Sequence, residues 1–296
     1  MSRTERPDRS PVEADADPLE VSFSTLDDGS GLVVTDLIER NQFRLLTDRP
    51  VSPTSVDPDG HRFPIDAAVA VDAAAIELPT VVSVCVRNDA GEMLAETEHS
   101  AYEEFPHDTY SLELCGPIKI YLRVDGPLTV AADVNRTRIE FDGERQVRVG
   151  ARSHHDSPAA TITTTDDPLD VMAAVSEFSS ALKTTSPERS YPTLRGHPPL
   201  VELGDRFAVP DGVVSPETGV RLELPPDYES VYVATPLAYY LAADVVPGGR
   251  PRLVTTDGFE HDLDTMRGFE TEVERVLKQT FFLDCVTRTE GYYSVD

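Results

Sequence analysis

The chain has no tryptophan, few lysines, few cysteines and no long apolar run. Its 26 basic residues include only three lysines, Lys119, Lys183 and Lys278, which leaves 23 arginines among 296 residues. The longest apolar stretches, such as the one from Ala67 to Ala75, are interrupted by charge. They fall well short of the ~20 apolar residues that a membrane-spanning helix needs. We therefore expect a soluble protein that has no membrane partner.

The first 18 residues are polar and charged and lack the features of a targeting signal. They contain no apolar leader, no twin arginine and no lipidation motif. The sequence therefore predicts a cytoplasmic protein.

The three cysteines, Cys85, Cys115 and Cys285, lie far apart in sequence and within apolar runs. An odd number without CxxC spacing argues against both a disulfide framework and a zinc site. A cysteine–histidine hydrolase needs a thiolate beside an imidazole, and apolar surroundings favour the neutral thiol. We expect three reduced thiols that pack in the core.

Acidic residues outnumber basic ones by 53 to 26, which gives a formal net charge of −27. Such a charge makes a compact chain repel itself unless salt screens it, and the Debye length falls from ~8 Å at physiological salt to ~3 Å near 1 M. The composition therefore resembles that of a halophilic, haloarchaeal cytoplasmic protein. The alternatives are an acidic tail, which the even spread of acids disfavours, and a nucleic-acid mimic, which would need spaced carboxylates on one face.

Direct nucleic-acid binding is not expected, because no cluster of Lys and Arg is available to neutralise a phosphate backbone.

The hydrophobic pattern predicts an α+β protein in which an antiparallel, β-sandwich-like N-terminal domain precedes a small mixed α/β domain. Residues 1–17 bury little and are predicted to form a disordered tail. Residues 18–152 alternate with a period of two, as in strands. Hairpins are expected at 19–38 and 81–97, and a four-stranded meander at 118–151.

Residues 153–167 are predicted to be a polar linker, and residues 168–296 to form a mixed α/β domain with two longer helices. The first helix begins with Asp167 as its N-cap and Pro168 in its first turn. The second should run from about 269 to 288. Between them we expect a strand at 231–234, a short helix at 237–242, a strand at 245–246 and a hairpin at 252–263. Residues 292–296 resemble the start of a strand.

Catalytic motifs are absent from the sequence. No GxSxG, GxGxxG, P-loop or HExxH pattern occurs, and paired carboxylates carry little information in so acidic a chain. Adjacent His154, His155 and Asp156 diverge in extended chain, so an exposed linker is favoured over a metal site. The Asp57-Pro58-Asp59-Gly60 run lacks the later calcium ligands and is expected to be a turn. We predict no cofactor, no metal and no catalytic residue, and the protein is more easily interpreted as a non-enzyme.

One loop stands out because arginine, tyrosine and histidine cluster in it. Between residues 189 and 199 arginine, tyrosine and histidine gather on a proline-stiffened segment without an intervening acid. Such a loop can grip an anionic group or a protein partner, or its arginines can simply satisfy neighbouring carboxylates. The candidate binding residues are Arg189, Tyr191, Arg195 and His197.

Three segments resemble parts of larger haloarchaeal proteins, some of which continue into a caspase-like (CHAT-type) region. They are Arg189 to Pro199, Val231 to Leu241 and Cys285 to Tyr293, mainly in the C-terminal third. The resemblance implies that this chain corresponds to the non-catalytic N-terminal part of such a protein, or to a stand-alone relative. No catalytic residue carries over, because the His and Cys motifs of those peptidases have no counterpart here.

These observations favour a non-catalytic binding, regulatory or scaffolding module that acts on a protein partner, and they leave open whether it takes a small-molecule ligand. The alternatives are an auxiliary portion of a CHAT-like cysteine peptidase and a hydrolase whose β domain binds carbohydrate. The absence of tryptophan counts against the last, because carbohydrate sites use aromatic stacking.

Overall fold

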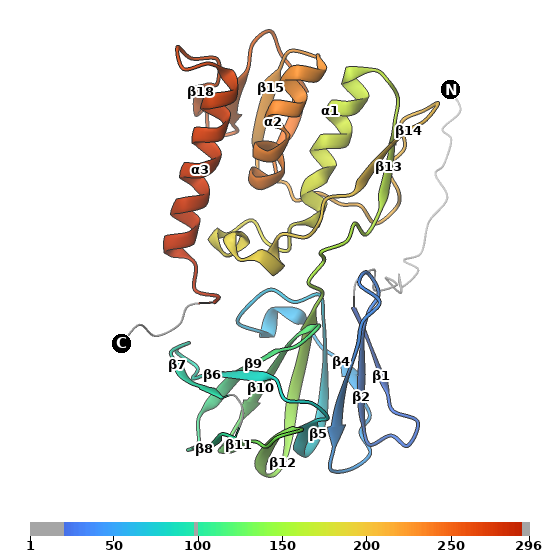
Figure 1. Ribbon diagram of the computed structural model, residues 1–296, viewed down its shortest axis with the longest axis vertical. Coiled ribbons are helices and arrows are strands. Elements are labelled where there is room, and N and C mark those ends of the chain that lie inside the picture. The colour runs from blue at the N-terminus through green and yellow to red at the C-terminus, as the bar shows by residue number, and fades with distance from the viewer. Residues whose placement is uncertain (1–20, 98–99, 292–296) are drawn as a thin grey trace, which may run out of the picture.

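The computed structural model describes residues 21–97 and 100–291, and they form an α+β fold in which antiparallel strands predominate. The predicted tail at 1–17 and the predicted strand at 292–296 lie outside the described residues. Figure 1 shows a large strand-rich part at one end of the molecule and a helix-bearing part at the other.

The strand-rich part is one 12-stranded sheet made from residues 21–152. Its main path runs β1-β2-β3-β5-β12-β10-β9-β6-β7, and β4, β8 and β11 pair alongside that path. The strands are β1 (Val21–Thr25), β2 (Gly31–Asp36), β3 (Gln42–Thr47), β4 (Thr54–Ser55), β5 (Ala67–Leu78), β6 (Ser83–Arg87), β7 (Met93–Thr97), β8 (Tyr102–Phe105), β9 (Thr109–Cys115), β10 (Lys119–Asp125), β11 (Leu128–Ala132) and β12 (Thr137–Arg152).

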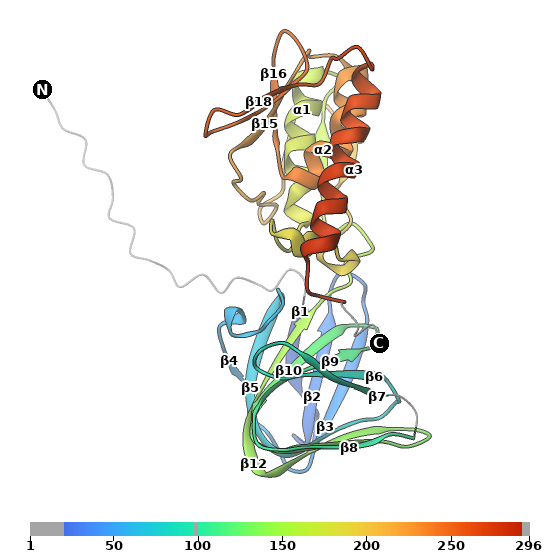
Figure 2. The same ribbon diagram turned by 90° about the vertical axis from the view of Figure 1, so that its left-hand side faces the viewer.

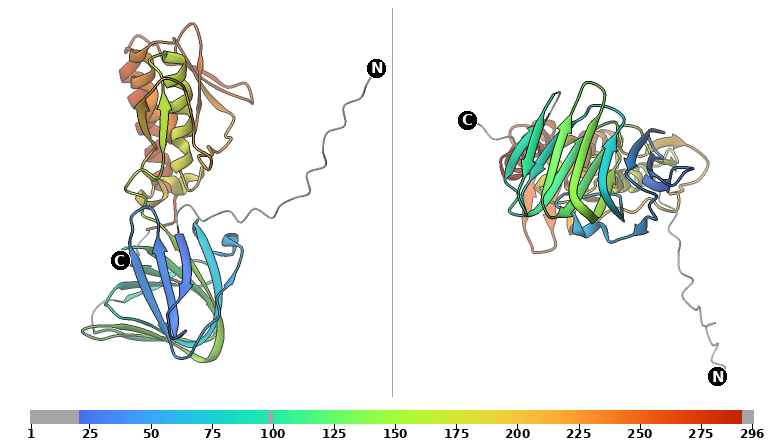
Figure 3. Two further views of the ribbon diagram at one scale, coloured as in Figure 1. Left: turned by 90° about the vertical axis from the view of Figure 1, so that its right-hand side faces the viewer. Right: turned by 90° about the horizontal axis from the view of Figure 1, so that it is seen from below.

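The sheet curls so that alternate side chains from nearly every strand meet in one apolar core. Ile120 and Leu122 of β10 and Val147 and Val149 of β12 are completely buried on the inner face. The residues between them, such as Tyr121, point to the outer face, as the two-residue period of a strand requires. Figure 3 shows from below how the blue N-terminal strands lie beside the green and teal strands.

The predicted hairpins at 19–38 and 81–97 are confirmed within the described residues, because β1 pairs with β2 and β6 with β7. The predicted turn at 57–60 is also present, as a short 3-10 helix (Pro58–Gly60) that Asp57 caps.

The predicted meander is wrong in two respects. Residues 137–152 form one long strand, β12, whose register shifts between Glu140 and Arg145 instead of turning back. In addition, β10 pairs with β9 and β12 rather than with its neighbour β11. The Asp-Gly signal at 142–143 therefore marks a bulge, a feature that lets a long strand bend around a core.

The helix-bearing part contains three α-helices and two small sheets. The helices are α1 (Pro168–Ser176), α2 (Tyr228–Leu241) and α3 (Phe269–Thr287), with 3-10 turns η2 (Glu177–Ala181), η3 (Pro187–Ser190) and η4 (Pro192–Leu194). The strands are β13 (Thr161–Thr164), β14 (Leu200–Leu203), β15 (Val220–Leu224), β16 (Asp244–Pro247), β17 (Arg252–Thr255) and β18 (Glu260–Asp262). Strand β13 lies inside the segment that was predicted to be a linker.

The helices lie on one side of the mixed sheet β16-β15-β17-β18, and Figure 2 shows this layering. Their contact buries a second apolar core that includes Leu222, Val231 and Leu237. Two predicted features are confirmed. Asp167 caps α1 through a bond from the Leu169 amide, and β17 pairs with β18 as a hairpin.

The predicted strand at 231–234 is wrong, because these residues lie in the middle of α2. Asp227 caps this helix by accepting from the Ser230 amide at 2.8 Å, ahead of the position where Pro236 suggested a helix start. Pro236 lies inside the helix and cannot donate to the carbonyl of Tyr232. Tyr232 is on the exposed side, where water can satisfy that carbonyl. The predicted strand–helix–strand unit does exist, but its first strand is β15, parallel to β16.

The outer face of the large sheet contacts the helix-bearing part through a buried polar cluster. At the end of β12, Arg152 pairs with Glu290, which follows α3, with 2.5 Å between Nη2 and Oε1, and both side chains are fully buried. The Tyr121 hydroxyl donates to the same carboxylate at 2.7 Å. Nearby, Lys183 forms a second buried ion pair with Asp66 at 3.0 Å. Residues 153–160 join β12 to β13 and are called the connecting segment below. The two ion pairs hold the parts of the molecule that this segment joins.

Candidate functional site

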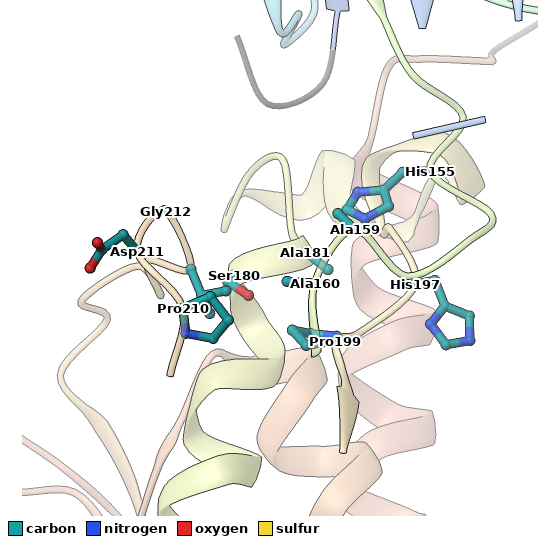
Figure 4. Close-up of a pocket in the computed structure, with 11 residues that line it drawn as sticks. His155, Ala159, Ala160, Ser180, Ala181, His197, Pro199, Pro210, Asp211 and Gly212 are labelled. Carbon is teal, nitrogen blue, oxygen red and sulfur yellow. The ribbon is translucent and has the colours of Figure 1, made fainter. Parts of the chain in front are cut away.

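A pocket of about 230 Å³ lies where the connecting segment meets the helix-bearing part. Four stretches line it: the chain after β12, the end of η2, the loop before β14 and the loop after it. Figure 4 shows the lining residues, which are His155, Ala159, Ala160, Ser180, Ala181, His197, Pro199, Pro210, Asp211, Gly212 and Val213.

Backbone hydrogen bonds hold His155 at one end of this pocket. The residue adopts a left-handed conformation, with φ of 53°, just after β12 ends. Its amide donates to Ser153 Oγ at 2.9 Å, and its carbonyl accepts from the His197 amide at 2.7 Å. The two histidines are thus brought together by main-chain contacts, while in Figure 4 the His197 ring points away from His155.

Gly196 makes room for the His155 ring. A Cβ at this position would lie 2.2 Å from Nδ1 of His155, so any other residue here would force the imidazole to move. The Gly196 amide donates to the carbonyl of Ala181, and its own carbonyl accepts from the Tyr239 hydroxyl at 2.5 Å. The close approach of backbone to imidazole therefore requires glycine at this point.

The His155 imidazole is buried without satisfying its polar atoms. The residue is 3% exposed, and neither ring nitrogen has a hydrogen-bond partner among residues 21–97 and 100–291. Burial lowers the pKa of His155, so its ring is neutral near pH 7, with one donor and one acceptor nitrogen. Leaving such a group unpaired costs about 1–3 kcal/mol, so the ring provides a strong local preference for a polar ligand atom.

The rest of the pocket wall is mostly apolar and carries no cationic side chain among the described residues. Alanine, proline and valine side chains supply most of the lining. The Ser180 hydroxyl donates to the carbonyl of Glu177 at 2.7 Å, so its oxygen can still accept a bond from a guest. The Asp211 carboxylate points away from the pocket in Figure 4. With a neutral imidazole and no arginine or lysine, the site suits an uncharged or cationic molecule.

The sequence-predicted residues separate into one that reaches this pocket and three that do not. His197 lines the rim, and its Nδ1 lies 2.7 Å from the carbonyl of Pro198.

Arg189 and Tyr191 have partners within the fold. The Arg189 Nε donates to the Asp284 carboxylate at 2.8 Å, and its guanidinium lies over the Tyr240 ring. The ring of Tyr191 is close to two cations, with Lys119 Nζ at 5.6 Å and the Arg288 guanidinium at 5.3 Å from its centroid.

Arg195 lies over the ring of Phe281 on α3, with 5.1 Å between the guanidinium carbon and the ring centroid. It therefore joins the predicted loop to the surface of α3 rather than to the pocket.

Two sequence-based interpretations of polar residues are corrected. His155 was expected in an exposed linker, but the chain folds back over it and buries it. No signal in the neighbouring sequence indicates this burial, because it depends on Gly196, some forty residues later. Cys115 was expected in apolar surroundings, but it is exposed at the end of β9, with its Sγ 3.8 Å from Lys119 Nζ.

Within the described residues, no three His, Cys, Asp or Glu side chains are grouped so that they could hold a metal ion. The helices of the same residues include none with the length and apolar character that crossing a membrane requires. Comparisons with protein-family models, with curated proteins and with solved structures gave no match.

Proposed function

We propose that this protein is a non-catalytic binding module that takes up a small uncharged or cationic organic molecule in the pocket beside His155. The observation that supports this function is the fully buried imidazole with two unpaired nitrogens at the end of an otherwise apolar cavity. Both ring nitrogens are closed off from water, so a guest pairs with one of them only when the imidazole turns toward the cavity. That pairing offsets the desolvation of the ring, and the apolar portion of the guest buries against the alanine and proline side chains.

The size of the pocket limits the guest. Drug-sized ligands occupy pockets of roughly 300–1,000 Å³, and liquid water takes about 30 Å³ per molecule. A pocket of about 230 Å³ therefore suits a small metabolite. The formal charge of −27 also disfavours an anionic guest, because a negatively charged protein repels anions.

The proposed setting is the cytoplasm of a salt-adapted, halophilic cell, as the composition indicates. In this setting the sandwich-like β domain serves as a rigid support that holds the connecting segment and its histidine through the Arg152–Glu290 contact. A ligand signal could reach a protein partner through the helix-bearing part.

The direct test measures binding of a panel of small amides, alcohols and primary amines in molar salt, by ligand-detected NMR and calorimetry. Ala159 lines the pocket and is exposed, so Ala159→Leu should fill the cavity without disturbing the core. Ala90 is an exposed residue of the β6–β7 turn, and Ala90→Leu is the matched control. The proposal predicts that at least one class of compound binds to wild type and to Ala90→Leu, and about tenfold or more weakly to Ala159→Leu.

Equal affinity for all three proteins would place the binding elsewhere and reject the pocket. Binding of carboxylates in preference to neutral or cationic compounds would contradict the argument from charge.

A second candidate function is docking of a protein partner on α3. Large apolar side chains are exposed on its C-terminal half, with Phe282 63%, Leu283 52% and Val286 59% exposed. Arg195 covers the neighbouring Phe281, so the predicted loop and this helix face form one surface. Exposed apolar groups in such a cluster are typical of interaction sites.

This candidate is tested by affinity capture in high-salt buffer with wild type, Phe282→Glu and an Arg195→Ala/His197→Ala double variant. A specific partner should be lost from both variants while their circular dichroism is unchanged. Retention of the partner by both variants would exclude this surface.

A further inference from the structure

Two cysteines lie together on the outer face of the large sheet. Strands β6 and β9 pair so that Cys85 is opposite Glu113 and Ser83 is opposite Cys115. Cys85 and Cys115 are therefore diagonal neighbours on one face, a position in which the Cβ atoms of paired strands lie roughly 7 Å apart or somewhat less. The two thiols are close enough that each shifts the pKa of the other, that of Cys85 upward and that of Cys115 downward.

The two thiols differ in access to solvent. Cys115 is exposed, whereas Cys85, on the adjacent strand, is 2% exposed. A reagent from solution can therefore reach Cys115 first, and Cys85 can reach only a group that is already attached to Cys115.

The charges around the pair favour a thiolate on Cys115. The neighbouring Cys85 thiol and the Lys119 ammonium lower the pKa of Cys115 to about 7, against the opposing effect of burial and of Glu113 and Glu96. The interaction with Cys115, together with burial, raises the pKa of Cys85. Lys119 comes from β10, directly opposite Cys115, and also pairs with Glu113.

We propose that Cys85 and Cys115 are a dithiol site that exchanges with small-molecule disulfides, with Cys115 as the attacking thiol and Cys85 as the resolving one. The proposal is independent of the pocket beside His155. It assigns chemistry to residues that the sequence pattern suggested were inert core cysteines.

The exchange has two balanced steps. The Cys115 thiolate attacks one sulfur of a disulfide RSSR, which forms a mixed disulfide and releases RS⁻. The Cys85 sulfur then attacks the Cys115 sulfur, expels the second RS⁻ and transfers its proton to that leaving thiolate. Two protein thiols are oxidised to one disulfide, and the external disulfide is reduced to two thiols.

Joining the sulfurs requires the two Cβ atoms to approach to about 4 Å, and the local backbone favours such a movement. Cys115 is the last residue of β9, and the chain turns at Gly116 immediately afterwards. A strand end can shift toward its neighbour at lower cost than a residue in the middle of a ladder, because fewer ladder bonds constrain it.

Intact-mass measurement of reduced wild-type protein after incubation with cystine tests the proposal without any substitution. The expected product has lost the mass of two hydrogens and carries no retained cysteine adduct. Peptide mapping should join the Cys85 and Cys115 peptides and leave Cys285 as a free thiol. A persistent adduct on Cys115, or no reaction at any cysteine, would overturn the proposal.

Single substitutions then separate the two roles. Cys85→Ser should trap one cysteine adduct on Cys115, because no thiol is present to resolve it, and Cys85→Ala provides the same readout should the serine perturb packing. Cys115→Ser should slow the reaction at Cys85 by about tenfold or more, because that thiol is shielded and has a raised pKa. Cys285→Ser is the matched control and should react as wild type does. A Cys115→Ser protein that forms a disulfide or adduct at the wild-type rate would contradict the assignment of the attacking thiol.

Discussion

Replacing Glu290 by glutamine should strongly destabilise the protein, because it leaves a buried positive charge without its counter-ion. Both members of the Arg152–Glu290 pair are fully buried. The carboxylate accepts from Nη2 of Arg152 at 2.5 Å, from Nη1 at 3.3 Å and from the Tyr121 hydroxyl at 2.7 Å. Glutamine keeps the shape and one acceptor oxygen, but it places an amide N–H₂ against the guanidinium.

The expected loss is about 3 kcal/mol of unfolding free energy, at the lower end of the range for breaking a buried ion pair. Arg152 keeps three neutral acceptors, the carbonyl of Pro64 and the hydroxyls of Thr193 and Tyr121, so its desolvation is partly offset. Replacing both partners, as in Arg152→Met/Glu290→Met, should cost less than the sum of the two single methionine variants, because neither charge is then left alone.

Urea unfolding in molar potassium chloride, followed by circular dichroism, measures these differences. The matched control is Arg250→Met, because Arg250 faces Asp262 at 3.7 Å with both side chains mostly exposed, and its removal should leave stability unchanged within error. A Glu290→Gln protein as stable as this control, or methionine variants whose effects simply add, would refute the view that this pair joins the two parts of the molecule.

Three further predictions concern acid stability, a helix cap and salt. Burial and the nearby Arg148 and Arg123 lower the pKa of His61 from 6.5 to about 4. Because the folded state disfavours the protonated ring, the free energy of unfolding is unaffected above pH 6.5 and decreases as the pH falls from 6.5 toward 4. Urea titrations should show a loss of about 2 kcal/mol over that window, after allowance for solvent screening, and His61→Gln should lack it; identical pH profiles would reject this cause. Asp227→Ala removes the N-cap of α2 and should cost about 1 kcal/mol in the same assay, and no change would show that the cap is dispensable. Dilution from molar to low salt should lower the melting temperature because of the net charge of −27, and a constant melting temperature would contradict the halophilic interpretation.

The periodic pattern predicted strands and capped helices well where one face of an element is solvated. The hairpin of β6 and β7 and the start of α1 at Asp167 follow directly from local signals. Strand β5 departs from the two-residue period predicted for residues 18–152, because it runs through the centre of the sheet with residues buried on both faces. The sequence predicted a strand and a short helix where the structure has the single helix α2, because a proline such as Pro236 is typical of the first turn of a helix. Pro236 is tolerated inside α2 because Tyr232, whose carbonyl loses its hydrogen bond, lies on the exposed side.

The candidate site could be predicted only in part. The concentration of unusual side chains at 189–199 pointed to a segment that does contribute His197 to the pocket. His155 could not be found in this way, because its burial depends on Gly196 and on a main-chain bond to a residue 42 positions later. The pairing of Cys85 with Cys115 likewise follows from strand order, since β6 and β9 are not consecutive in sequence.

The most direct test of the pocket is a measurement of intermolecular nuclear Overhauser effects between a bound panel compound and protein labelled at alanine methyls and histidine rings. The account predicts effects from the compound to the ring proton of His155 and to the methyls of Ala159, Ala160 and Ala181, together with a shifted ¹⁵N resonance of the His155 ring. Binding that leaves the His155 resonances unchanged, or effects confined to other residues, would contradict it.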